Sequence, residues 1–147
     1  MQIHEVYPYL HPADPEAAIA FYGKAFGAEE KFRLVEPGGR IGHVELLFGE
    51  ATLMLSAPFP ELGIQAKDPE GPCNFLIHLH VEDADRVMAD AVSAGAKVVV
   101  EAADQFWGER SGRVRDPFGY DWMIGHSIED ISPGEMQARY TLIHQDN

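Results

Sequence analysis

Two stretches of the chain repeat apolar residues at helical spacing and are built alike. Residues 14–28 read DPEAAIAFYGKAFGA, and residues 83–96 read DADRVMADAVSAGA. Each begins with an aspartate suited to cap a helix and ends in Gly-Ala, where glycine accepts the left-handed backbone that closes a helix. The pattern predicts helices over Pro15–Phe26 and Ala84–Ala94.

Strand-like apolar runs surround both predicted helices in the same order, with one run before each helix and three shorter runs after it. The predicted strands are 3–10, 29–35, 42–48 and 51–57 in the first half and 75–81, 97–102, 112–116 and 121–126 in the second. Gly95 follows Gly27 by 68 positions, and Phe118 follows Phe48 by 70. Two offsets this close indicate two copies of one βαβββ unit.

The copies divide the chain into four parts that together make one domain of 147 residues. The first module covers 1–57 and the second covers 74–126. Between them, 58–73 is rich in proline and glycine and is interpreted as a linker. The tail, 127–147, holds one short amphipathic piece around 134–140, which we expect to pack on a partner surface or to fray.

Composition narrows the class of protein. The formal net charge is −13, from 24 acidic and 11 basic residues, which disfavours nucleic acid and favours neutral or cationic partners. The single Cys73 cannot form an intrachain disulfide, so a reducing cytoplasm is the expected location. No apolar run is long enough to span a membrane, and the N-terminus lacks the pattern of a leader. We therefore expect a soluble, unprocessed cytoplasmic protein with no membrane partner.

An ordered set of motifs resembles the vicinal oxygen chelate superfamily, which groups glyoxalase I, extradiol dioxygenases and bleomycin-resistance proteins. The resemblance is closest to its PhnB-like branch. The motifs span nearly the whole chain: AAIAFYGKAFGAEE (17–30), GRIGHVELLFG (39–49), LMLS (53–56), HVEDAD (80–85), DQFWGERSGRVRDPFGYDWMI (104–124) and HSIED (126–130).

The resemblance implies an α+β fold in which two βαβββ modules with curved mixed sheets form a cleft, helices outside, and a homodimer as the usual assembly. It also implies four inward-facing metal-ligand positions, on the first and last strand of each module. Aligned here, these positions fall on Tyr7, Leu53, Leu76 and Met123. None is a normal ligand for Zn²⁺, Ni²⁺ or Fe²⁺, so no cofactor is expected at the family's metal site.

Strand alternation predicts which other residues share the inward face. The residues expected to bind a ligand are Tyr7, Tyr9, His43, His78, Phe106, Trp107 and Arg113. His43 beside Glu45 is either a general acid/base pair or an ordinary polar pair in a hairpin. His78 and His80, with His43, form the alternative of a relocated divalent-metal site; the competing interpretation is that these histidines only form hydrogen bonds.

The aromatic and basic candidates also have two interpretations each. Phe106 and Trp107 either stack on a planar ligand at a cavity mouth or fill the core or a dimer seam. Arg110, Arg113 and Arg115 either pair with carboxylates, which the acidic composition favours, or hold an anionic group of a ligand.

Three hypotheses for function follow. The first is a dimer whose cleft binds or sequesters a small aromatic or cationic molecule without a metal. The alternative is a metal-dependent lyase, isomerase or dioxygenase with relocated His/Glu ligands. A third, an interaction module for a protein partner, has no specific sequence feature in its favour.

Overall fold

The computed structural model describes residues 1–145 and contains two units with the same element order. The first unit consists of β1 (Tyr9–Leu10), α1 (Pro15–Phe26), β2 (Glu29–Val35), β3 (Ile41–Phe48) and β4 (Ala51–Leu55), followed by a short 3₁₀ helix η1 (Pro60–Leu62). The second consists of β5 (Leu76–His80), α2 (Ala84–Ala94), β6 (Lys97–Asp104), β7 (Glu109–Arg115) and β8 (Asp121–Ser127), followed by α3 (Pro133–Ile143).

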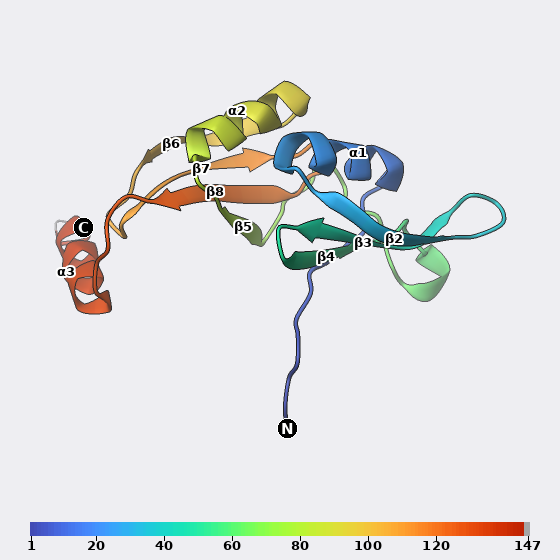
Figure 1. The fold of residues 1–147 in the computed structure, drawn as a ribbon, viewed down its shortest axis with the longest axis horizontal. Helices are drawn as coiled ribbons and strands as arrows, with labels where there is room; N and C mark the ends of the chain where they lie inside the picture. Colours follow the sequence, from blue (N-terminus) through green and yellow to red (C-terminus); the bar gives the residue numbers. More distant parts are fainter. Residues whose placement is uncertain (146–147) are drawn as a thin grey trace.

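Each unit folds into one four-stranded sheet (Figure 1). The strand orders are β1-β4-β3-β2 and β5-β8-β7-β6. In both sheets the first pair is parallel and the other pairs are antiparallel. The α+β fold of two βαβββ units that the internal repeat predicted is confirmed.

The first two helices begin and end where the sequence pattern placed them. Asp14 Oδ1 accepts a hydrogen bond from Ala17 N–H at 3.1 Å, and Asp83 Oδ1 accepts one from Arg86 N–H at 3.1 Å. α1 ends at Gly27, whose φ of 70° lies in the left-handed region that favours glycine. Local hydrogen bonds from the capping aspartates therefore determine where both helices begin.

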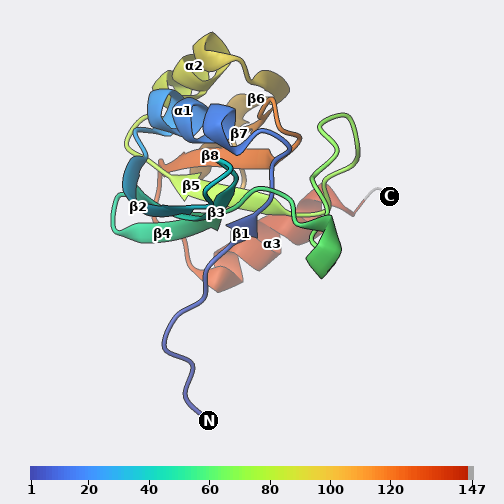
Figure 2. The same cartoon turned by 90° about the vertical axis from the view of Figure 1, so that its right-hand side faces the viewer.

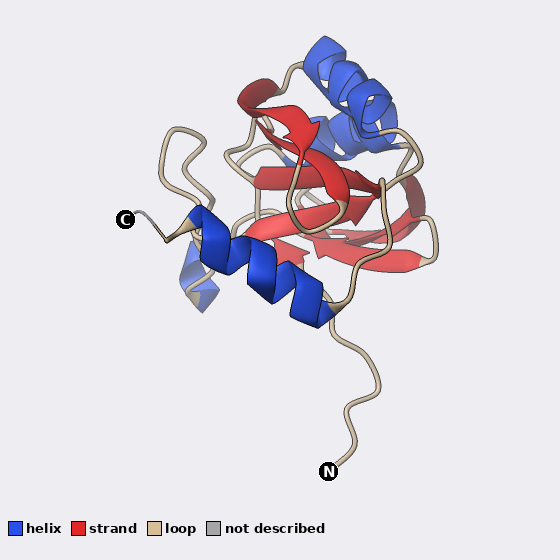
Figure 3. Ribbon diagram, turned by 90° about the vertical axis from the view of Figure 1, so that its left-hand side faces the viewer, coloured by secondary structure: helices blue, strands red, loops and turns tan. Residues whose placement is uncertain are grey.

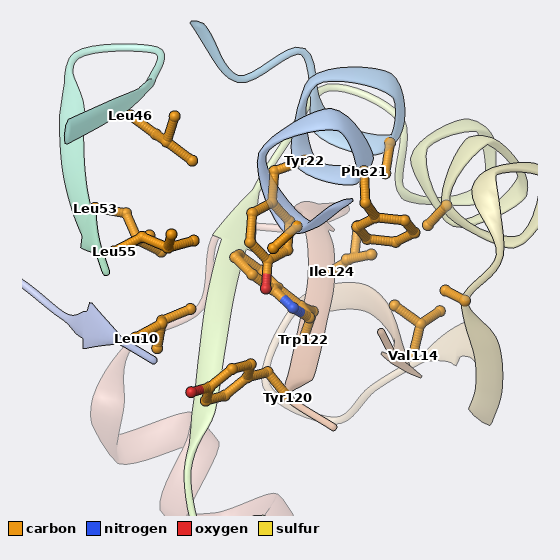
Figure 4. Packing of buried hydrophobic residues seen from close by; sticks show 14 of the residues in the cluster. Leu10, Phe21, Tyr22, Leu46, Leu53, Leu55, Val114, Tyr120, Trp122 and Ile124 are labelled. Atoms are coloured by element: carbon orange, nitrogen blue, oxygen red, sulfur yellow. The ribbon is translucent and has the colours of Figure 1, made fainter. Parts of the chain in front are cut away.

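The main hydrophobic core lies between the sheets and α1 and α2, which lie side by side on the same side of the molecule (Figures 1 and 2). Trp122 on β8 and Tyr22 on α1 are fully buried, with ring centroids 5.1 Å apart. Figure 4 shows Leu46, Leu53 and Leu55 of the first unit pointing toward these rings. One continuous core thus joins the two units.

Asp116, at the turn between β7 and β8, ties the units together with hydrogen bonds inside this core. Its carboxylate accepts from Tyr22 Oη–H at 2.6 Å, from Trp122 Nε1–H at 2.8 Å, and from the backbone N–H groups of Phe118 and Tyr120 at 2.9 and 3.0 Å. Burial raises the pKa of Asp116, while these donors act in the opposite direction. The side chain links α1 of the first unit to β8 of the second.

The predicted first strand, 3–10, is much shorter in the structure. Only Tyr9 and Leu10 pair, with Met54 and Leu55 of β4. The preceding residues lead away from both sheets, and Ile3 and Val6 are exposed at 69% and 83% (Figures 1 and 2). Apolar alternation predicted an extended segment but not its pairing, and the register with β4 begins only at Tyr9, opposite Met54.

The hairpins that close the two units differ in length, which corrects one sequence alignment. Phe48 pairs with Ala51 across a two-residue turn, whereas Arg115 pairs with Asp121 across the longer turn containing Asp116. Met54, not Leu53, therefore occupies the place in the first sheet that Met123 occupies in the second. A slip of one residue turns side chains to the opposite face, and Leu53 lies in the core with 3% exposure.

Helix α3 lies beyond the end of the second sheet and covers more residues than the predicted piece around 134–140 (Figure 3). Arg139 holds it in place: Nη1 donates to the Phe106 carbonyl at 3.0 Å and to Glu129 Oε1 at 2.5 Å. The Tyr140 ring lies 5.5 Å from the Phe106 ring. Within residues 1–145, none of the helices has both the length and the apolar character needed to cross a membrane.

Candidate functional site

The site candidates lie mostly on the sheet faces turned away from α1 and α2, which we call the open faces. Strand register aligns one row of side chains across each sheet. In the first sheet this row contains Tyr9, Met54, Glu45 and Phe32. In the second sheet the matching row contains His78, Met123, Arg113 and Val100. The predicted ligand-binding residues therefore divide between two faces of one chain.

On the first open face, three predicted residues form one hydrogen-bonded chain. Tyr9 Oη lies 2.6 Å from His43 Nδ1, and His43 Nε2 lies 3.2 Å from Glu45 Oε2. Lys31 Nζ approaches the other oxygen of Glu45 at 3.9 Å. Tyr9 also stacks on His11, with ring centroids 4.9 Å apart. The structure therefore brings Tyr9, His43 and Glu45 together and satisfies their polar atoms within one sheet.

The hydrogen-bond chain determines where its protons lie. Burial raises the pKa of Tyr9, so its hydroxyl is protonated at neutral pH and donates to His43 Nδ1. His43 in its neutral form then carries its proton on Nε2 and donates it to Glu45. The basic lone pair of His43 is thus engaged by Tyr9, and a proton leaving Tyr9 has a direct path to His43.

The second open face holds a cavity of about 250 Å³. Trp107 forms part of its wall, with Leu76 and Met123 on the neighbouring strands. Arg113 is the one charged residue in the lining; the rest of the lining is apolar or neutral, and comprises Leu76, Val100, Gln105, Trp107, Ser111, Gly112 and Met123. This cavity unites four positions named from the sequence with Gln105 and Val100, which strand alternation did not single out.

Phe106 does not share the cavity with its neighbour Trp107. The two rings meet edge to face with centroids 5.1 Å apart, and Phe106 turns toward Tyr140 of α3. Of the two interpretations of this aromatic pair, the structure places Trp107 at the cavity and Phe106 in the contact that seats α3.

The three clustered arginines also separate into two kinds. Arg110 pairs with Asp85 and Asp104 at 2.7 and 3.1 Å, and Arg115 pairs with Asp121 at 2.8 Å. Arg113 forms no ion pair with any residue that the structure describes, and its buried Nε has no hydrogen-bond partner there. Arg110 and Arg115 are held by carboxylates as the composition favoured, and Arg113 is left available to a ligand.

A second His–Glu pair, which the sequence did not suggest, lies on the second open face. His78 Nε2 approaches Glu109 Oε2 at 3.5 Å. Gly125 lies between them on β8: a Cβ there would meet Glu109 Oε2 at 2.9 Å, so the glycine makes room for the carboxylate. Glu109 Oε2 is buried and has no hydrogen-bond partner within the described chain. Strand alternation could have predicted this position, because Glu109 lies four residues before Arg113 on β7 and therefore faces the same side of the sheet.

A cleft of about 390 Å³ lies between the two units. Tyr7 and neighbouring residues before β1 line one side. Residues of the β3–β4 hairpin including Leu53, residues of β5 including His78, and Trp122 line the rest. Tyr7 thus lies near the junction of the units rather than beside Tyr9 on the first open face.

The residues at the family's metal positions do not fit a divalent metal. With Met54 in place of Leu53, the four positions carry a phenol, two thioethers and an isobutyl group, none of them a usual ligand. The relocated set is also divided: His43 belongs to the first sheet, and His78 and His80 to the second. His80 Nε2 lies 3.1 Å from Ser127 Oγ instead. No group of three or more His, Cys, Asp or Glu side chains among the described residues is arranged to hold a metal ion.

Comparison with known proteins agrees with this architecture. The model of the Glyoxalase/Bleomycin resistance protein/Dioxygenase superfamily matches residues 8–124, and the chain belongs to this family. An uncharacterized protein of Mycobacterium bovis is 39% identical over 134 residues, which cover 89% of this chain and 88% of that protein.

Solved structures show the same fold at lower sequence identity. A glyoxalase-related enzyme from Fulvimarina pelagi superimposes with a TM-score of 0.66 at 22% identity, covering 84% of this chain and 88% of that one. A glyoxalase/bleomycin resistance protein/dioxygenase family enzyme from Burkholderia phytofirmans gives 0.67 at 19% identity, covering 82% and 96%. At these identities the likeness concerns the fold alone.

Proposed function

We propose that this chain binds a small aromatic molecule on the second open face and holds it without chemical change. The observation that carries the proposal is the cavity of about 250 Å³, in which the flat Trp107 side chain is accessible beside the apolar Leu76 and Met123. Concave, mostly apolar sites with a few polar groups are the usual form of small-molecule sites. Membership of a superfamily whose name includes bleomycin resistance supports binding as a function, and the motif run 104–124 leads us to place the chain in the PhnB-like branch.

We infer further that binding requires no metal. The support is the donor set at the family positions, where Tyr7, Met54, Leu76 and Met123 replace histidine and carboxylate ligands. Metal analysis of protein purified without chelator tests this: we expect less than one-tenth of an equivalent of Zn, Ni, Mn or Fe. A near-stoichiometric metal that is lost in a His78→Ala variant would instead support the relocated-ligand lyase, isomerase or dioxygenase.

We propose that the working form is a homodimer. Residues 1–7 have strand-like alternation but lie outside the described strands, and a second copy of the chain offers strand edges for them. The open faces also expose large apolar side chains, which an interface with a second copy would bury; these include Phe32, Leu34, Leu76 and Val100. Light scattering after size-exclusion chromatography is expected to give twice the chain mass, and a stable monomer at micromolar concentration contradicts the proposal.

Acid–base catalysis is a second candidate, favoured by the chain Tyr9, His43, Glu45. Its hydrogen bonds suit a tyrosine that gives or takes a proton while His43 relays it and Glu45 stabilises the imidazolium. The two candidates use different faces, so variants separate them. Tyr9→Phe abolishes turnover if the relay is catalytic and leaves binding on the second face unchanged.

The test of the binding proposal is a Trp107→Ala variant. Loss of a stacking surface is expected to weaken an aromatic ligand such as 2-naphthoate by about tenfold, as measured by calorimetric titration. Phe106→Ala is the matched control, because this neighbour lies outside the cavity lining. Equal affinity of the wild-type chain and the Trp107→Ala variant contradicts the assigned site.

A further inference from the structure

Arg113 differs from the other arginines of this acidic chain. Of the six others, five form ion pairs with carboxylates, and these are Arg33, Arg40, Arg110, Arg115 and Arg139. The sixth, Arg86, lies exposed on α2. Arg113 is half-buried, and its Nε is shielded from solvent without a hydrogen bond to any described residue. A guanidinium N–H that is shielded from water without a hydrogen bond is costly, so an acceptor beside Nε would be favourable.

The surroundings of Arg113 point to a ligand as the source of that acceptor. The cavity lining contains no carboxylate, although the chain has 24 acidic residues. The neighbours on its row are the uncharged Met123 and Val100. Trp107 lies in the same cavity, and Gln105 and Ser111 supply neutral polar atoms at its edge. A single positive group beside a flat ring is a pattern that selects an anion on an aromatic frame.

We propose that Arg113 anchors the carboxylate of a planar aromatic acid whose ring lies against Trp107. This inference rests on the proposed binding function and specifies the class of ligand. The guanidinium matches a carboxylate in shape and charge and donates two parallel hydrogen bonds to it. A neutral ring of the same size offers Arg113 an uncharged acceptor at most, and a cationic ring is repelled by it.

Cavity size and long-range charge are consistent with this class of ligand. About 250 Å³ lies just below the roughly 300–1,000 Å³ of common ligand sites, which limits the ligand to one or two rings. The net charge of −13 repels an acid at a distance, but salt at physiological concentration screens charges beyond about 8 Å. The contact with Arg113, formed inside the cavity, outweighs the distant surface charges.

The experiment titrates the full-length chain with three probes of one shape: 2-naphthoate, 2-naphthamide and 2-naphthylmethylammonium. Calorimetry at about 0.15 M salt is expected to show the acid binding about tenfold to 100-fold more tightly than the amide, which is typical of a charged hydrogen bond. Arg113→Gln is expected to remove this preference while leaving the affinity for the amide unchanged. Arg113→Lys keeps the positive charge but lacks the planar guanidinium, and it is expected to retain part of the preference for the acid over the amide.

Arg110→Gln is the matched control, because it removes the same charge from the same strand at a site already paired with Asp85 and Asp104. It is expected to change the affinity for the acid by less than about twofold. If Arg113→Gln does not fold, the acid-to-amide ratio of the wild-type chain still decides the question.

Three results overturn the inference. In the first, the amide or the ammonium probe binds as tightly as the acid; the proposed binding function then still stands. In the second, Arg110→Gln weakens binding of the acid as much as Arg113→Gln does, so that the effect is one of net charge. In the third, none of the three probes binds, and this contradicts both the inference and the proposed function.

Discussion

The two open faces are built on matching strand rows, yet they handle charge in opposite ways. In the first sheet Glu45 is enclosed by partners, with His43 Nε2 at 3.2 Å and Lys31 Nζ at 3.9 Å. At the matching place in the second sheet stands Arg113, which has no such partner among residues 1–145. Glu109, at the start of the same strand, has an oxygen that His78 Nε2 approaches at 3.5 Å but that accepts no hydrogen bond from the described residues.

This difference shows that two copies of one scaffold can carry different sets of polar side chains on matching faces. A polar network that satisfies itself adds stability and rigidity, whereas buried polar atoms without partners are retained at a cost and mark a site. The same fold therefore carries a closed polar network on one face and an open set of polar groups on the other. Function follows from the side chains on each face, since one scaffold hosts many functions.

The largest expected effect comes from breaking the link between the two units. Asp116→Asn is expected to lower the free energy of unfolding by about 2–4 kcal/mol. The amide replaces one acceptor oxygen by a donor, so two of the four donors around it lose their partner. Urea unfolding measures the change. Asp104→Asn, at an exposed carboxylate on β6, is the control, and an equal loss in both variants contradicts a special role for Asp116.

A smaller effect tests how α2 packs on the second sheet. A Cβ at Gly112 would meet Met88 Sδ at 2.5 Å and the backbone nitrogen of Ala102 at 2.9 Å. Gly112→Ala is therefore expected to cost about 1–3 kcal/mol through overpacking. Gly42→Ala is the matched control in the first sheet, where the nearest atom lies at 3.6 Å. Thermal unfolding of both variants gives the comparison. An unchanged melting temperature in Gly112→Ala would show that α2 moves away from the new methyl group without loss of stability.

The smallest effect compares the two glutamates directly, and the two substitutions are expected to differ in the size of their cost. Glu45→Gln removes a charge that His43 and Lys31 approach, and it is expected to cost about 0.5–1 kcal/mol. Glu109→Gln removes a charge that, among the described residues, only His78 Nε2 approaches, at 3.5 Å and without a hydrogen bond, so its cost is expected to be below about 0.5 kcal/mol. Chemical unfolding at neutral pH measures both. A larger loss at Glu109 than at Glu45 reverses the contrast between the faces.

Much of the fold was predictable because its signals are local. The caps Asp14 and Asp83 and the terminal glycines Gly27 and Gly95 determine both helix boundaries from within a few residues. Alternation along β3 separated His43 and Glu45 from the core residue Val44. These patterns need no knowledge of distant parts of the chain.

The errors arose where pairing between segments decides the outcome. Residues 3–7 have the pattern of a strand but pair with no strand within residues 1–145. Leu53 was placed on the wrong face because the two closing hairpins differ in length, and one residue of slip exchanges the faces. Glu109 was not predicted as a site residue. Its carboxylate can approach His78 only because Gly125 has no side chain to block it, and sequence spacing does not show this.

The sequence by itself determined the duplicated βαβββ plan and the helices α1 and α2, since these depend on residue type and spacing along the chain. The tertiary structure alone decided which of the three clustered arginines lacks a carboxylate partner among the described residues, and which glutamate is enclosed by partners. That choice depends on the register of strands and on side chains that meet across a sheet, and such contacts have no signature in spacing. Arg113 can be told apart from Arg110 and Arg115 only in the structure, where the other two form ion pairs with Asp85 and Asp121.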